Sequence, residues 1–183
     1  MKIDIGGGTV PAPGYLNVDP VHGDSVRVRS GYDVRDLKVR VQDGIPLEAG
    51  SVEAARASHV LEHVPKEGGQ LLAAMNEVWR VLRPGGEFET IVPCAGFTSE
   101  HVPDEQRSPV QRQAVGPVYN GWQPWADPTH VSFWWYPESW WYFTGGPGGA
   151  FRANADYGIR YWEWGDGRLV DGWEAHVTLV KPR

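Results

Sequence analysis

The sequence predicts an α/β fold, and three of its features support this class. Residues 2–5 have the pattern of a short strand, and residues 87–92 alternate between polar and apolar before they become apolar, which also indicates a strand. Between them, residues 67–82 place leucine, methionine, valine and tryptophan at helical spacing. Near the end, aromatic and β-branched runs at 158–164 and 173–180 flank Gly-Asp-Gly, which is typical of an antiparallel hairpin. We expect the 183 residues to form a single domain, 1–183.

The first predicted strand, Lys2–Ile5, runs directly into three glycines, Gly6–Gly8. Consecutive glycines allow positive φ angles and let the backbone approach a ligand closely. A second strand is expected at Leu16–Asp19, with the acid at its carboxyl end. Only residues 9–15 separate the two strands, whereas a parallel crossover usually needs a dozen or more residues. The crossover therefore has no room for a full helix.

The middle of the chain gives signals of unequal strength. Residues 26–28 and 32–34 are weak strand candidates. Residues 52–58 are alanine-rich and could be helical by propensity, but we expect a strand over their second half because of the segment that follows. Pro84-Gly85-Gly86 is expected to end the long helix, because proline and glycine stop helices at this position.

The second half of the chain is unusually aromatic. Eight of the 10 tryptophans lie between residues 119 and 164. Residues 94–150 are also rich in proline, and a long irregular segment in a compact domain is usually a functional loop. We therefore predict an aromatic cap or lid over 94–150. Within it, Trp140 and Trp141 are typical of a short amphipathic helix packed inward.

Charge and cysteine content narrow the possible partners and location. The net charge of −6 argues against duplex nucleic acid bound by bulk electrostatics. Cys94 is the only cysteine, which excludes an internal disulfide. Because the start MKIDIGGG lacks the apolar run of a signal peptide and no stretch reaches membrane-spanning length, we expect a cytoplasmic protein that does not enter the membrane.

The stretch His59-Val60-Leu61-Glu62-His63 spells H-x-x-E-H, an inverted zinc-protease signature. Such a site needs both histidines on one helical face and a third ligand downstream. Val64-Pro65 follows immediately, and proline disfavours helix at the preceding residue. We therefore predict no metal site, and a zinc hydrolase remains a minor alternative. A further alternative is that His63 packs locally and caps the next helix.

Several runs together resemble a known family. They are DIGGG (4–8), GYLNVD (14–19), SVEAARASHVLEHVP (51–65), EVWRVLRPGGEFETIVP (77–93) and DPTH (127–130). The set resembles the class I S-adenosylmethionine-dependent methyltransferases, specifically the small type 11 group. The resemblance implies a Rossmann-like sheet, mostly parallel, with a C-terminal antiparallel hairpin. The short crossover adds reduced N-terminal helices, and the contiguous glycines depart from the usual acid-x-Gly-x-Gly-x-Gly motif.

The resemblance implies an enzyme that uses S-adenosylmethionine, and it suggests a role for each matching residue. Asp4 corresponds to the acid of the first motif, and Gly6, Gly7 and Gly8 lie against the amino-acid and ribose parts. Asp19 accepts hydrogen bonds from the ribose hydroxyls, although it could simply start a turn before Pro20. Asp36 and the backbone of Leu37 face the adenine edge, a role for which Asp33 competes. Ser58 and His59 border the methyl-bearing sulfur.

Methyl transfer chiefly requires alignment of donor and acceptor, and a base is needed only if the acceptor loses a proton. His130 is our first candidate base, followed by His59 and then His101, although a loop histidine bonded to its own turn is an equal alternative for His130. The acceptor is expected to be a small or flat molecule, methylated on oxygen or nitrogen under an aromatic cap. The predicted acceptor-binding residues are Tyr119, Trp122, Trp125, His130 and Trp134.

The sequence leaves a second class of function open. The short first crossover is also compatible with a catalytically silent module that binds carbohydrate or a protein partner through its aromatic surface. Tight cofactor binding with methyl turnover would exclude that alternative. The sequence is compatible with either a monomer or a homodimer, because an aromatic surface of this size could be buried between two copies.

Overall fold

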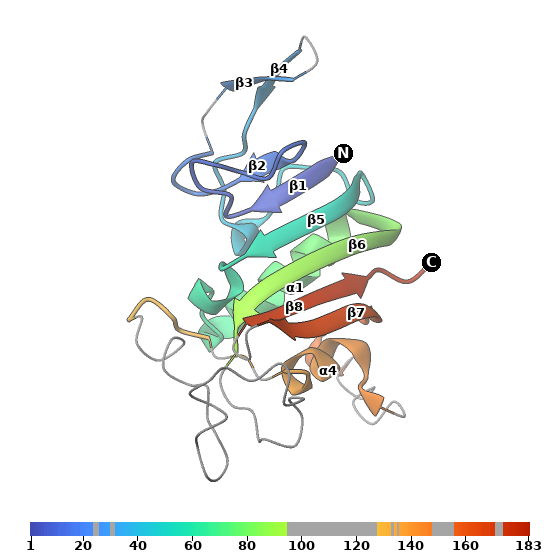
Figure 1. Ribbon diagram of the computed structural model, residues 1–183. Helices are drawn as coiled ribbons and strands as arrows, with labels where there is room; N and C mark the ends of the chain where they lie inside the picture. Colours follow the sequence, from blue (N-terminus) through green and yellow to red (C-terminus); the bar gives the residue numbers. More distant parts are fainter. Residues whose placement is uncertain are drawn as a thin grey trace.

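The computed structural model describes residues 1–23, 26–29, 32–94, 128–132, 134, 136–147, 156–170 and 174–183. Six strands form one sheet in the order β2-β1-β5-β6-β8-β7 (Figure 1). Their bounds are β1 Lys2–Ile5, β2 Leu16–Val18, β5 Val52–Ser58, β6 Leu82–Pro93, β7 Glu163–Val170 and β8 Glu174–Val180. The sheet therefore contains strands from both the beginning and the end of the chain.

Strand directions confirm the predicted α/β class. Strands β2, β1, β5 and β6 pair in parallel, and β8 pairs antiparallel with both β6 and β7. The first crossover, residues 6–15, contains only turns and irregular backbone, as its length predicts. The carboxyl ends of β1, β5 and β6 point toward the same edge of the sheet (Figure 1). That edge is where ligands of open α/β sheets bind.

Helix α1, Gln70–Val81, packs one apolar side against the sheet. Its buried residues Leu71, Met75 and Val78 follow the helical spacing expected from the sequence. The helix begins three residues later than predicted, because Gly68 and Gly69 both have positive φ and residues 67–69 form a 3-10 turn. At its other end, Leu82 leaves the helix and starts β6 directly.

The two faces of the sheet differ in chemistry. On the face that α1 covers, register aligns Ile3, Ala55, Phe88 and Leu179 across four strands, and all are buried. The opposite face carries an ionic row in the same register, in which Arg56 lies 3.8 Å from Asp4 and 3.1 Å from Glu89. The shortened first crossover explains this polarity, because no helix from residues 6–15 covers the face.

Helix α4, Glu138–Thr144, confirms the inward-packed aromatic helix. Trp140 is fully buried and donates from Nε1 to Thr90 Oγ1 of β6 at 3.1 Å. Its ring lies 4.9 Å from that of Trp134, centroid to centroid. No helix in the described part of the chain is long and apolar enough to span a membrane.

Two local predictions need correction. Gly165-Asp166-Gly167 does not form the hairpin turn, because it lies inside β7 and the chain reverses between Val170 and Glu174. Gly165 instead occupies a bulge, where a Cβ atom would come within 3.0 Å of the Thr178 carbonyl oxygen. Residues 52–58 form a strand over their whole length, not only their second half.

The weak strand candidates also form, but outside the main sheet. Strands β3 Val26–Arg29 and β4 Tyr32–Arg35 pair only with each other, antiparallel (Figure 1). The chain then returns to the main sheet, where Leu37 makes a parallel bridge with Val18.

Candidate active site

A cleft of about 360 Å³ lies at the carboxyl ends of β1 and β2. Gly6, Val18, Val60, His63 and Gln70 are among its lining residues. Its volume falls at the lower end of the usual range for small-molecule sites. A larger cavity of about 750 Å³ lies beside α1 and residues 158–160, but no strand residue lines it. The strand-end cleft is therefore the better candidate site.

Side chains from β2 hold the glycine loop in place. Asn17 Oδ1 accepts a hydrogen bond from the Gly7 amide at 3.1 Å, and Asn17 Nδ2 donates to the Gly8 carbonyl at 2.9 Å. Gly8 N donates to Asp19 Oδ2 at 3.2 Å. Gly6 has φ +67°, and a Cβ atom there would lie 2.4 Å from Val60 Cγ2. Glycine is therefore required where the loop passes Val60.

The two predicted acids of this region both bond to backbone amides. Asp4 is buried, and its Oδ2 accepts from Ala12 N at 2.7 Å, which ties down the crossover. Asp19 Oδ1 accepts from the amides of Val21 and His22, both at 2.7 Å. Asp19 therefore does start a turn, as the alternative interpretation predicted. Among the described residues, Gly8 N donates to Asp19 Oδ2, and a carboxylate oxygen can accept a second hydrogen bond.

The two residues that are predicted to contact the adenine, Asp36 and Leu37, lie at the sheet edge next to β2. Leu37 N donates to Asn17 O at 2.8 Å, and Asp36 Oδ1 accepts from Asn17 N at 3.1 Å. Neither Asp36 nor Leu37 lines the cleft, whereas residues 39–42 do. Asp33 lies on β4, in the separate hairpin.

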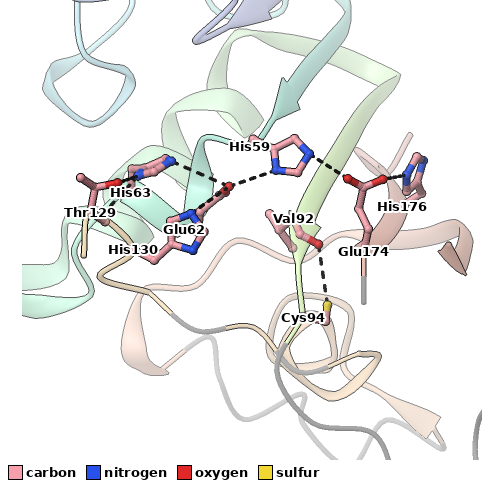
Figure 2. A network of polar contacts seen from close by, with 9 residues as sticks. All are labelled: His59, Glu62, His63, Val92, Cys94, Thr129, His130, Glu174 and His176. Carbon is pink, nitrogen blue, oxygen red and sulfur yellow. Dashed lines mark hydrogen bonds and ion pairs between the residues drawn. The ribbon is translucent and has the colours of Figure 1, made fainter. Parts of the chain in front are cut away.

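The H-x-x-E-H segment does not form a helical pair of histidines. Ser58 is the last residue of β5, and His59 follows with φ +55°. Residues Leu61–His63 make a single 3-10 turn. His59 and His63 therefore lie on different sides of Glu62, as Figure 2 shows.

A chain of six ionisable side chains, the Glu62 network, lies at this edge of the sheet (Figure 2). The Glu62 carboxylate is 1% exposed and lies at its centre. Its Oε1 lies 3.5 Å from His59 Nδ1, 3.9 Å from His63 Nε2 and 4.0 Å from His130 Nε2. The network consists of His59, Glu62, His63, His130, Glu174 and His176.

Glu174 of β8 extends the network toward the antiparallel strands. Its two carboxylate oxygens contact His59 Nε2 at 2.8 Å and His176 Nε2 at 2.6 Å. The Glu62 carboxylate raises the pKa of His59, burial lowers it to a lesser degree, and the charge of Glu174 adds to the rise. His59 thus has a carboxylate at each ring nitrogen, which favours the protonated imidazolium.

The segment 128–132 brings His130 into the network. The amides of Val131 and Ser132 both donate to the Glu62 carbonyl oxygen, at 2.8 and 2.9 Å. Ser132 Oγ also donates to the Val64 carbonyl. The rings of His63 and His130 meet edge to face with centroids 4.8 Å apart. The DPTH histidine therefore lies beside the HVLEH segment, 67 residues earlier in the chain.

The predicted acceptor cap is described only in part. Trp134 is 1% exposed and packs against Trp140 and Phe143, so the structure places it in the core. The other predicted cap residues and the third candidate base lie outside the described residues; they are Tyr119, Trp122, Trp125 and His101.

Comparison with known proteins agrees with this fold. Residues 12–90 match a family described as "Methyltransferase domain". The matched segment covers less than half of the 183 residues, and over that segment the chain is similar to the methyltransferase domain. A search of curated proteins gives no match.

Solved structures of low sequence identity share the fold of this chain. The 1,6-didemethyltoxoflavin-N1-methyltransferase of Burkholderia thailandensis superposes with TM-score 0.56 at 15% identity, over 100% of this chain and 71% of that one. A Haloferax volcanii protein in complex with the Trm112 methyltransferase activator gives 0.55 at 15% identity, over 100% and 82%. A methyltransferase of Methanosarcina mazei gives 0.53 at 14% identity, over 99% and 92%.

Several residues that build this candidate site carry no recognisable signal in the sequence. Glu62 appears there only as a letter of the H-x-x-E-H motif, between Leu61 and His63. Glu174 and His176 lie on β8, 115 residues from the histidine that Glu174 contacts, and no local pattern connects them. Asn17 is a buried polar residue inside a three-residue strand, and its role in holding the glycine loop needs the structure.

Proposed function

We propose that this chain is a class I methyltransferase that transfers the methyl group of S-adenosylmethionine to an oxygen or nitrogen of a small acceptor. The observation that supports this most is the glycine loop after β1, which Asn17 of β2 and Asp19 hold by hydrogen bonds and whose first residue, Gly6, lines the strand-end cleft. The Burkholderia thailandensis enzyme of the same fold has S-adenosylhomocysteine and the small molecule 1,6-didemethyltoxoflavin bound. That pairing supports a small acceptor for this chain as well.

In this proposal the cofactor lies across the ends of β1, β2 and β5. Gly6, Gly7 and Gly8 contact its amino-acid and ribose parts, and Asp4 positions them through the crossover. Asp19 binds the ribose hydroxyls through Oδ2. Asp36 accepts a hydrogen bond from Asn17 N of β2 and so fixes the start of the segment that follows. After Leu37, this segment reaches residues 39–42, which line the cleft and would contact the adenine.

Ser58 and His59 border the methyl group, because they end β5 at the same edge of the sheet. The chemical step is an in-line displacement at a carbon that the sulfonium already activates, so alignment is the main task. Where the acceptor loses a proton, His130 is the better base. His59 is less suited, since carboxylates occupy both of its ring nitrogens.

Location and assembly complete the proposal. The buried, single cysteine suits a cytoplasmic protein, and the acidic net charge disfavours duplex nucleic acid. We propose a monomer or homodimer. Sedimentation of the purified chain with and without added Trm112-type activator would show whether it forms a complex of the kind that the Haloferax volcanii protein forms.

The decisive test is calorimetric titration of the folded protein with S-adenosylhomocysteine. We expect wild-type binding, a large loss in Asp19→Ala, and a smaller loss in Asp19→Asn, which keeps an oxygen for the amides of residues 21 and 22. Glu48→Gln, an exposed acid away from the cleft, should bind as wild type does.

A folded wild type that ignores both S-adenosylhomocysteine and S-adenosylmethionine would contradict the proposal. The silent binding module would then be the better account. If wild type and Asp19→Ala bind S-adenosylhomocysteine equally well, the proposed function stands, but Asp19 does not bind the ribose.

A further inference from the structure

We infer that Glu62, His63 and His130 bind one divalent transition-metal ion. One ligand atom from each residue lies within 4.8 Å of the other two. Glu62 and His63 come from the 3-10 turn after β5, and His130 comes from the docked segment 128–132. Figure 2 shows both imidazoles turned toward the Glu62 carboxylate.

The Glu62 carboxylate is buried, and a metal ion would stabilise it in addition to its ion pair with His59. It is 1% exposed, and neither oxygen has a hydrogen-bond donor within the described part of the chain. The nearest ring nitrogen, His59 Nδ1, lies 3.5 Å away, which is longer than an ordinary hydrogen bond. A buried, unbonded carboxylate is costly, and coordination of a metal is one of the few ways in which proteins satisfy it.

His63 is held in the orientation that a metal ligand requires. Its Nδ1 lies 3.1 Å from both the carbonyl oxygen and Oγ1 of Thr129. When Nδ1–H donates to that carbonyl, Nε2 keeps its lone pair and directs it toward Glu62. A ring nitrogen that donates to a backbone carbonyl is the usual outer partner of a metal-bound histidine.

The Glu62 backbone fixes the third ligand. Its carbonyl oxygen accepts from the amides of Val131 and Ser132, the two residues that follow His130. The same short turn therefore supplies two ligands, Glu62 and His63, and positions the third, His130. This ligand set differs from the pair that H-x-x-E-H spells, because His59 Nε2 contacts Glu174 instead.

The donor atoms favour zinc or a similar ion over calcium and magnesium. Two imidazole nitrogens and one carboxylate oxygen form a three-ligand set that zinc uses when a fourth position stays open. Calcium and magnesium prefer oxygen ligands alone. Ligands about 2.0–2.1 Å from a tetrahedral ion lie about 3.3 Å apart. The present distances of 3.9 and 4.0 Å from Glu62 Oε1 would thus contract by roughly 0.6–0.7 Å on binding, and the distance between the two histidine ligand atoms, which is within 4.8 Å, would shorten to a similar value.

Metal binding would change the role of His130 in the proposed reaction. A metal ion and a proton compete for Nε2, so His130 cannot be both ligand and base at that atom. His63 lines the cofactor cleft, which places the ion next to the proposed methyl donor. The metal inference itself does not need the methyl donor, and the two can be tested separately.

The test uses untagged protein stripped with a chelator and titrated with zinc by calorimetry and with cobalt by visible absorption. We expect one ion per chain and a cobalt spectrum of tetrahedral type. Glu62→Gln should weaken binding at least about 100-fold, since even second-shell losses reach 10–100-fold. His22→Asn removes an exposed histidine away from the cluster and should bind as wild type does.

His63→Gln provides a second variant in case Glu62→Gln does not fold, and circular dichroism checks each one. A folded, stripped wild type that binds neither ion would overturn the inference, as would equal affinity in wild type and both ligand variants. S-adenosylhomocysteine is titrated into the same stripped sample. Cofactor binding without metal binding would reject the site and leave the proposed function intact, and the reverse result would reject only the function.

Discussion

In the glycine loop, two of the three positions leave no space for a side chain. Gly7 has no space for a side chain, because a Cβ atom would lie 2.7 Å from Pro11 Cβ and 2.8 Å from Asn17 Oδ1. Gly6 faces Val60 from the turn after β5. Gly8 differs, since nothing lies within 4 Å of its Cβ position and only its φ of +57° favours glycine. Two of the three glycines are therefore required by close packing.

This packing predicts the effect of one methyl group. Gly6→Ala should destabilise the protein more than Gly14→Ala, because both positions have positive φ but only Gly6 faces a clash. The shared backbone strain is about 1–2 kcal/mol. Gly6→Ala should also lower the affinity for S-adenosylhomocysteine, whereas Gly14→Ala should not. Urea unfolding and calorimetry measure the two effects.

The double variant Gly6→Ala/Val60→Ala gives the matched control for this clash. Removing the methyl groups of Val60 should restore part of the stability lost in Gly6→Ala. If the double variant loses the simple sum of the two single losses, the contact between Gly6 and Val60 is not the cause.

Among the elements, α1 is joined to the preceding chain by one ion pair with several hydrogen bonds. Arg80 donates to both oxygens of Glu77, at 2.7 and 2.8 Å, and also to the carbonyls of Ile45 and Leu47, both at 2.9 Å. Glu77 Oε1 in turn accepts from Ile45 N at 2.6 Å. The pair therefore links the helix to residues 45–47.

The same pair predicts a pH dependence of stability. Arg80 lowers the pKa of Glu77, and the Ile45 amide adds to the shift while burial opposes it. A depressed folded-state pKa means that the stabilisation is present above the ordinary carboxyl pKa and is lost as the pH falls through the folded value. Glu77→Gln should therefore cost about 1–2 kcal/mol at neutral pH and progressively less in acid.

Urea unfolding of wild type and Glu77→Gln at pH 7 and pH 3 measures this difference. The exposed Glu48→Gln serves as control and should cost little at either pH. A Glu77→Gln cost that is the same at both pH values would show that the lost interaction is not ionic.

For the whole molecule, the sheet determines which parts are stable. Strands β5 and β6 are central and pair on both sides, and their buried face packs against α1. The β3–β4 pair has only its own two strands, an arrangement that is marginal in water. Strand β7 is at an edge of the main sheet. Stability should therefore decrease from the centre of the sheet outward.

Hydrogen exchange followed by mass spectrometry tests this gradient. Peptides from β5 and β6 should exchange slowest, those from β7 faster, and those from β3–β4 fastest of the strands. Saturation with S-adenosylhomocysteine should slow exchange at the glycine loop and at residues 39–42, because they border the cleft. Slow exchange throughout β3–β4 would contradict the view of these strands as an isolated pair.

The sequence alone determined the types of most elements. Alternation, helical spacing and punctuation by glycine and proline are local, so β1, β2, α1 and β8 could be predicted from neighbouring residues. Local signals gave a wrong prediction where the same sequence pattern is compatible with two different structures. Gly165-Asp166-Gly167 satisfies a turn and equally a bulge, and only pairing with β8 decided for the bulge.

The tertiary structure alone decided how the site is assembled. The sequence singled out the glycine loop, Asp19, His59 and His130, because motif residues are close together in the chain. It could not show that Glu62 lies buried among three histidines, or that Glu174 reaches His59 from 115 residues away. Such contacts depend on strand order and on the docking of segment 128–132, and no periodicity of a few residues encodes them.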